Sequence, residues 1–125
     1  MADLLNLHPK VRAAAAQLVK TMREAGYMAM ITSGYRSPRA QAVLRRKYET
    51  CLARGRPECL PAARPGLSEH NYGLAVDVVT DAPPEHRQYI AESVGLTYAG
   101  TADPVHYGAF SFSEWLSLLK QAGIV

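Results

Sequence analysis

The sequence lacks the apolar run of about 20 residues that a membrane-spanning helix needs, so we expect no membrane insertion. Its first ten residues, MADLLNLHPK, lack the charged segment and the long apolar stretch of a secretory signal. We therefore expect synthesis in the cytoplasm without a signal peptide. Neither HExxH nor CxxC occurs, which excludes the most familiar linear zinc motifs.

Cysteine is also scarce, because the only two are Cys51 and Cys59. Their spacing is too wide for a zinc knuckle. They can form a disulfide between the end of a helix and the loop that follows it, or stay reduced in a protein made in the cytoplasm. The sequence leaves both possibilities open.

Acidic residues are few in the segment 36–64, which holds eight bases and two acids and so carries a net charge of +6. The whole chain has a net charge of +3, so the remainder is acidic. A basic segment attracts nucleic acid, anionic lipid or an anionic cell wall. No helix-turn-helix, zinc finger or base-stacking motif accompanies it, and we expect no nucleic-acid partner.

The length of 125 residues fits one domain, 1–125. Apolar spacing, prolines at helix starts and glycines at helix ends predict four helices separated by short apolar strands. The predicted helices are 9–25, 38–53, 84–94 and 112–119, the strands are 27–32, 74–79, 96–99 and 105–108, and a proline-rich loop covers 54–68. This order indicates an α+β fold in which helices flank a small antiparallel sheet. We expect Trp115, in the last helix, to lie in the core.

One acid interrupts an apolar strand, because Asp77 lies within Leu74 to Val79. Burying an isolated carboxylate is costly, so such a group is normally paired or bound to a metal. His70 lies seven residues earlier, and side-chain alternation directs Asp77 to one face of the sheet. A catalytic zinc usually has three protein ligands, and His106 is the best candidate for the third.

A second interpretation uses the same residues without a metal. Asp77 can pair with Arg36, His70 can be a turn residue, and His106 can be a hydrogen-bonded core group. Spacing alone leaves the two interpretations equal.

Three segments in order, SGYRS at 33–37, SEHNYGLAVD at 68–77 and DPVH at 103–106, resemble the motifs of the zinc D-Ala-D-Ala carboxypeptidase family. That family includes vancomycin-resistance dipeptidases and the L-alanyl-D-glutamate endopeptidases of phage endolysins. The resemblance covers most of the chain, and the central motif, S-x-H-x-x-G-x-A-x-D, is the specific one. It implies the compact α+β fold shared with the Hedgehog signalling domain.

The resemblance also implies roles for individual residues. The zinc ligands would be His70, Asp77 and His106. Asp103 would be the general base, and Arg36 would bind a substrate carbonyl or carboxylate. Ser68 and Tyr35 would line the substrate cleft.

The function implied is a zinc metallopeptidase that cuts the stem peptide of peptidoglycan. Most carboxypeptidases of the family have Glu where this chain has Asp103, and aspartate there resembles the phage enzymes. We therefore expect cleavage at L-Ala-D-Glu by a monomeric phage lysin, with a holin-type export partner. It would act on the wall after phage-mediated release or as a virion component. The alternatives are a D-Ala-D-Ala carboxypeptidase and a non-catalytic, zinc-stabilised wall-binding module, which would not need Asp103.

Overall fold

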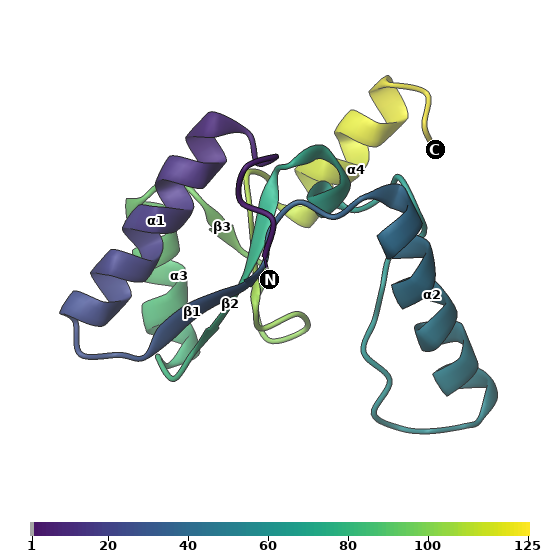
Figure 1. Ribbon diagram of the computed structural model, residues 1–125, viewed down its shortest axis with the longest axis horizontal. Helices are drawn as coiled ribbons and strands as arrows, with labels where there is room; N and C mark the ends of the chain where they lie inside the picture. Colours follow the sequence, from purple (N-terminus) through teal and green to yellow (C-terminus); the bar gives the residue numbers. More distant parts are fainter. Residues whose placement is uncertain (1) are drawn as a thin grey trace.

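The computed structural model describes residues 2–125, which form helices packed around a four-stranded sheet (Figure 1). The elements are α1 (Pro9–Glu24), β1 (Ala29–Ser33), α2 (Pro38–Ala53), the 3-10 helix η1 (Glu69–Tyr72), β2 (Ala75–Thr80), α3 (Pro84–Ser93), β3 (Thr97–Tyr98), β4 (His106–Gly108) and α4 (Phe112–Gln121). The predicted α+β class with a small antiparallel sheet is confirmed.

The strands lie in the order β1-β2-β4-β3, and every neighbouring pair is antiparallel. The acid-bearing strand β2 is therefore internal. Its residue Asp77 lies directly opposite His106 of β4 and, after a register shift in β1, opposite Ser33. Directly opposed residues on neighbouring strands project to the same face of a sheet. Strand pairing alone thus brings the acid and one of the predicted histidines together.

The hydrophobic core lies between the sheet and the helices α1 and α3. Val76 and Val78 are fully buried there, and Asp77 between them points to the opposite face. The core is completed by Leu7, Val11, Ala15, Leu18, Met22, Ala29, Ile90, Ala91, Leu96 and Tyr107. Apolar side chains cover one face of the sheet, and the polar side chain of Asp77 lies on the other face.

Helix starts follow the sequence signals closely. Proline opens α1, α2 and α3, and the Ser37 hydroxyl caps α2 by accepting from the Ala40 N–H. At α4, Ser111 and Glu114 form the predicted reciprocal capping box.

Several predicted bounds differ from the structure by one or two residues, and three local differences have an identifiable contact. Strand β1 begins at Ala29, because the Met28 N–H donates to the Asp81 carboxylate instead of to a neighbouring strand. Leu74 precedes β2, because its N–H closes the η1 turn on the Glu69 carbonyl. Trp115 is half-buried and lies outside the core, where its Nε1–H donates to the Leu67 carbonyl at 2.8 Å.

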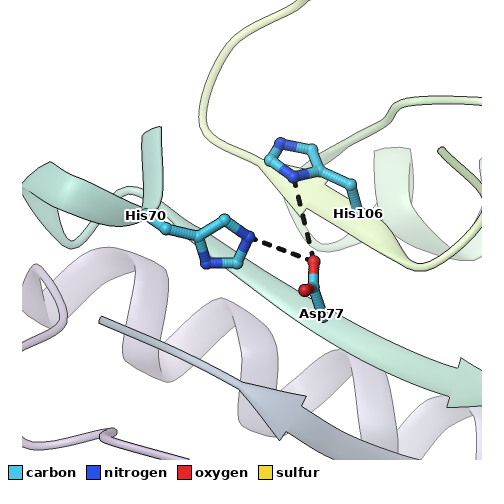
Figure 2. A group of neighbouring side chains, drawn as sticks. All are labelled: His70, Asp77 and His106. Atoms are coloured by element: carbon cyan, nitrogen blue, oxygen red, sulfur yellow. Dashed lines mark hydrogen bonds and ion pairs between the residues drawn. The ribbon is translucent and has the colours of Figure 1, made fainter. Parts of the chain in front are cut away.

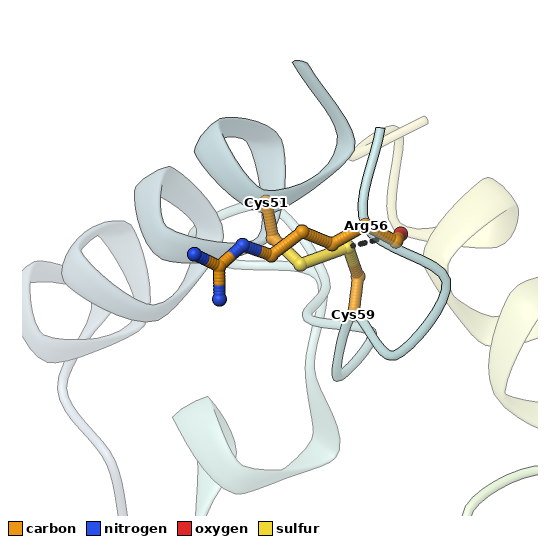
Figure 3. Close-up of a disulfide and its surroundings, with 3 residues drawn as sticks. All are labelled: Cys51, Arg56 and Cys59. Carbon is orange, nitrogen blue, oxygen red and sulfur yellow. Dashed lines mark hydrogen bonds between the residues drawn. A yellow bond between two sulfur atoms is a disulfide. The ribbon is translucent and has the colours of Figure 1, made fainter. Parts of the chain in front are cut away.

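Helix α2 and the loop 54–67 project from the sheet as an arm (Figure 1). Gln41 is the one fully buried residue of α2. A disulfide joins Cys51 of α2 to Cys59 of the loop (Figure 3), so the structure has the bridged form of the two that the sequence left open. Within residues 2–125, no helix has the length and apolar character needed to cross a membrane.

Candidate metal centre

The three predicted ligands meet on the open face of the sheet (Figure 2). His70 comes from η1, Asp77 from β2 and His106 from β4. Each offers one ligand atom, and these atoms lie within 4.8 Å of one another. His70 and His106 are far apart in sequence, and the η1 turn and the pairing of β2 with β4 bring them together.

His70 is held in a defined orientation. Its Nδ1 lies 2.8 Å from the Gly34 carbonyl oxygen, which can only accept, so Nδ1 carries the hydrogen. Nε2 faces the cluster, 3.0 Å from Oδ1 of Asp77. The η1 turn that carries the ring ends at Gly73, whose φ of 70° suits glycine. A Cβ at this position would also meet the Asn6 carbonyl oxygen at 2.6 Å.

Asp77 uses its two carboxylate oxygens differently. Oδ1 faces His70, and Oδ2 lies 3.4 Å from Nη2 of Arg36. Burial by itself would raise the pKa of Asp77, but the hydrogen bond and charge of His70, with His106 and Arg36, bring it below the usual value. The carboxylate is therefore ionised at neutral pH. The pairing with Arg36 exists together with the cluster, so this pairing does not exclude a metal site.

His106 presents Nδ1 to the cluster, 3.9 Å from Oδ1 of Asp77 and 3.9 Å from Oδ2 of Asp103. Its Nε2 points away, toward Glu69, whose Oε1 is 3.7 Å distant. Burial would lower the pKa of His106, but Glu69, Asp103 and Asp77 together raise it above its ordinary value.

Asp103 lies at the solvent-facing edge of the cluster, with a side chain that is 60% exposed. Partial burial and the charge of Asp77 raise its pKa above the ordinary value, against the opposing effect of His106. It is near the three ligands without belonging to their set. An accessible carboxylate with a raised pKa suits the transfer of protons to and from a substrate.

The donor set fits zinc. Two imidazole nitrogens and one carboxylate oxygen are the ligands of many catalytic zinc sites, which keep one position for water or substrate. One nitrogen of each histidine faces the cluster and the aspartate is ionised, as zinc binding requires. The residues present can therefore hold the ion that the sequence predicts.

A family model described as "VanY: D-alanyl-D-alanine carboxypeptidase" matches residues 4–113. This chain belongs to that family. No curated protein matches it significantly. The family assignment confirms the resemblance seen in the motifs, although nothing in it identifies a phage member.

Solved structures share the carboxypeptidase fold at low sequence identity. A VanY mutant from a VanB-type resistance cassette, solved with Zn(II), has a TM-score of 0.62 and 20% identity over 93% of this chain and 79% of its own. The LD-carboxypeptidase LdcB has a TM-score of 0.65 and 20% identity, covering 93% and 64%. DacB, an L,D-carboxypeptidase from Streptococcus pneumoniae, has a TM-score of 0.60 and 23% identity, covering 98% and 80%.

In this carboxypeptidase-family chain, Arg36 lies beside the cluster with a side chain that is only 17% exposed. Its Nη2 donates to Ser33 Oγ at 2.9 Å as well as to Asp77, and its Nη1 donates to Gln41 at 3.0 Å. The guanidinium is therefore fixed before any substrate arrives. Its role toward substrate stays a prediction.

The two residues predicted to line the cleft have local structural roles. The Ser68 hydroxyl caps η1 by accepting from the His70 N–H at 3.1 Å. The Tyr35 N–H donates to the Asp3 carbonyl at 2.8 Å, which attaches the N-terminal segment. Their contribution to substrate binding stays a prediction.

Sequence reasoning missed Glu69, a buried acid next to His70. Its position next to a predicted ligand gave no sign of its orientation. The 3-10 geometry of η1 directs Glu69 toward β4 and His70 toward Asp77 of β2. The available signal was the small residue Gly108 in β4, which leaves room for the carboxylate.

Proposed function

We propose that this chain is a zinc-dependent peptidase that hydrolyses the stem peptides of peptidoglycan. The observation that carries the proposal is the cluster of His70, Asp77 and His106, with the accessible carboxylate of Asp103 at its edge. Two of its fold neighbours are described as VanYB in complex with D-alanine-D-alanine and as LdcB, a structure revealing peptidoglycan recognition.

Each residue has a separable task in this proposal. Zinc held by the three ligands would lower the pKa of a bound water toward about 7 and polarise the scissile carbonyl. Asp103 takes a proton from the attacking water and delivers it to the leaving amine. Arg36 keeps its charge at any working pH and stabilises the oxygen on which negative charge develops.

We further propose that the scissile bond is internal, between L-Ala and D-Glu, and the Arg36 contacts support this choice. Both hydrogens of Nη2 are engaged, by Ser33 and by Asp77. A terminal carboxylate that makes two parallel hydrogen bonds to a guanidinium contacts either Nη1 and Nη2 or Nε and Nη2. Both arrangements therefore need an Nη2 hydrogen. An internal carbonyl needs only one donor, which Nη1 or Nε of Arg36 can supply.

Two synthetic stem peptides test the bond. The zinc-loaded protein should cleave a tetrapeptide stem after L-Ala, and it should leave terminal D-Ala on a pentapeptide stem. Mass spectrometry identifies the fragments. Release of D-Ala without a cut after L-Ala would overturn the internal-bond proposal and leave the peptidase proposal standing. If the protein cleaves neither peptide and does not cleave purified peptidoglycan, both the internal-bond proposal and the peptidase proposal are overturned.

A D-Ala-D-Ala carboxypeptidase is the second candidate, because the matching family model carries that description. The same two peptides distinguish it. A non-catalytic wall-binding module is disfavoured by Asp103, because a structural zinc site needs no base. That module would bind walls without releasing fragments.

We also propose that the protein acts as a monomeric phage lysin, free or virion-associated, that reaches the wall with a holin-type partner. The support is the aspartate at 103 and the HNYGLAVD segment at 70–77, which resemble phage members. Co-expression with a membrane-pore protein should lyse a bacterial host, whereas expression alone should not. Equal lysis in both cases would contradict the need for export.

A further inference from the structure

Glu69 is a buried acid to which the proposed function gives no task. Its residue surface is 5% exposed. An isolated ionised carboxylate in such a position is strongly unfavourable, so its partners should account for it. Oε2 accepts from the Phe110 backbone N–H at 3.3 Å, and Oε1 lies 3.7 Å from Nε2 of His106.

Space for this carboxylate is built into β4. A Cβ at Gly108 would lie 2.4 Å from Oε2 and 2.9 Å from Oε1 of Glu69. Gly108 has no positive φ, so the requirement at this position is for space and not for an unusual backbone conformation. The strand that carries His106 thus also provides, two residues later, the room that lets Glu69 reach the ring.

The two nitrogens of His106 face different groups. Nδ1 faces the cluster, 3.9 Å from Asp77, and Nε2 faces Glu69. A carboxylate only accepts hydrogen bonds, so Glu69 favours the tautomer with hydrogen on Nε2 and leaves the Nδ1 lone pair toward the cluster. The separation of 3.7 Å is longer than a hydrogen bond, and such contacts often shorten when the site is loaded.

We propose that Glu69 is a positioning residue that sets the tautomer and ring orientation of His106, so that Nδ1 binds the metal. The inference rests on the proposed zinc site and deepens it. In His70 the two nitrogens have exchanged positions, because Nδ1 donates to the Gly34 carbonyl and Nε2 faces the cluster. One backbone carbonyl and one buried carboxylate therefore prepare the two histidines, each through the nitrogen that does not face the cluster.

The first experiment needs no metal and no substrate. Nitrogen-15 NMR of the zinc-free protein, at a pH where His106 is neutral, should show hydrogen on Nε2. In Glu69→Gln, one amide oxygen must serve both His106 and the Phe110 N–H, so the Nδ1–H tautomer should gain population. A wild-type ring with hydrogen predominantly on Nδ1 would overturn the proposal, even if the variant failed to fold.

The second experiment measures zinc affinity by competition with a chelator. Glu69→Gln should bind zinc about 10–100-fold more weakly, the usual effect of losing such a supporting contact. Its hydrolysis should recover when zinc is raised to saturation. Unchanged affinity would overturn the inference.

Matched variants separate the outcomes. Glu92→Gln makes the same chemical change at an exposed site on α3, on the far side of the sheet, and should bind zinc as the parent does. Asp103→Asn alters the carboxylate near Nδ1 and should lose turnover while keeping zinc. If the wild type cleaves no stem peptide, the proposed function fails, but the NMR and zinc measurements still decide the role of Glu69.

Discussion

At the scale of single residues, the site is a set of side chains whose protonation is arranged by their neighbours. Asp77 is held ionised by His70, His106 and Arg36, and the His70 ring is oriented by a carbonyl. Asp103 remains accessible at the edge. The predicted ligands and the predicted base therefore differ in environment as well as in position, and substitution should separate their roles.

Replacing a ligand should abolish metal binding, whereas replacing the base should not. His70→Ala or His106→Ala should lose zinc and activity together. Asp103→Asn should retain about one zinc per chain and lose about 10²–10⁴-fold in rate, the usual scale for a general base. Metal analysis and peptide hydrolysis check both. Full zinc occupancy in both histidine variants would contradict the ligand assignment.

Zinc affinity should depend on pH through His106. The pKa of this ring is raised above 6.5, so zinc must displace a proton at and somewhat above that pH. Apparent affinity should rise with pH until the raised pKa is passed, by about tenfold per pH unit for each proton displaced. Chelator competition at several pH values measures it. A flat profile between about pH 6 and 8 would contradict the shift.

The same shift affects the zinc-free protein. A folded-state pKa above the unfolded value stabilises the fold below pH 6.5, and this contribution is lost as pH rises through the raised pKa.

At the scale of elements, the buried side chain of Gln41 links the arm formed by α2 and the loop 54–67 to the site. Gln41 is 1% exposed. Its Oε1 accepts from Arg36, and its Nε2 donates to the Ala63 carbonyl at 2.8 Å. The amide therefore connects the loop to the guanidinium beside Asp77.

Gln41→Leu should weaken this connection. It leaves an Arg36 donor and the Ala63 carbonyl without their partner, a loss of about 1–3 kcal/mol in the free energy of unfolding. We expect lower kcat/KM with unchanged zinc affinity, because no ligand is altered. Denaturant unfolding and hydrolysis assays measure these effects. Gln88→Leu, at an exposed position on α3, is the control. Equal effects of the two variants would contradict the positioning of Arg36 by Gln41.

The disulfide should stabilise the free end of the arm. Closing the short chain segment between Cys51 and Cys59 contributes roughly 2–3 kcal/mol when the bond is unstrained. Thiol titration of the unfolded protein without reductant should find no free thiol. Addition of reductant, or Cys51→Ser with Cys59→Ser, should lower the unfolding midpoint by a corresponding amount. Two titratable thiols in the untreated protein would contradict the bridge.

At the scale of the whole molecule, most of the excess positive charge lies on the arm, while Arg36 lies at the site. The segment 36–64 carries a net charge of +6 on the projecting arm and its attachment, while the remainder of the chain is acidic (Figure 1). Such a separation favours association with an anionic polymer in a salt-dependent way. An anionic cell wall is the partner that agrees with the proposed function.

Reversing charge on the arm should therefore affect walls and not small substrates. Arg54→Glu with Arg56→Glu should reduce sedimentation with intact walls by about tenfold at low salt and much less at high salt. Hydrolysis of a soluble stem peptide should be unchanged. Arg12→Glu with Lys20→Glu, two exposed positions on α1, is the matched control. Equal loss in both pairs would contradict a role for the arm.

The sequence by itself determined the element order, the helix starts and the candidate ligand set. Prolines and capping residues act locally, so Ser37, Ser111 and Glu114 marked helix boundaries that the structure reproduces. Alternation in a strand is local too, and it separated Asp77 from Val76 and Val78. The assignment of His70 and His106 rested on the resemblance to the family motifs, and the structure brings both rings to the acid.

Only the tertiary structure decided the rest, because it depends on contacts between distant segments. Register between β2 and β4 placed Asp77 opposite His106, and no local pattern specifies register between strands so far apart in sequence. Glu69 meets His106 because η1 turns it toward β4, where Gly108 leaves the space. Gln41 reaches Arg36 and the loop together only once the arm has folded. A motif can thus identify candidate metal ligands, whereas contacts between distant segments determine which residues surround them.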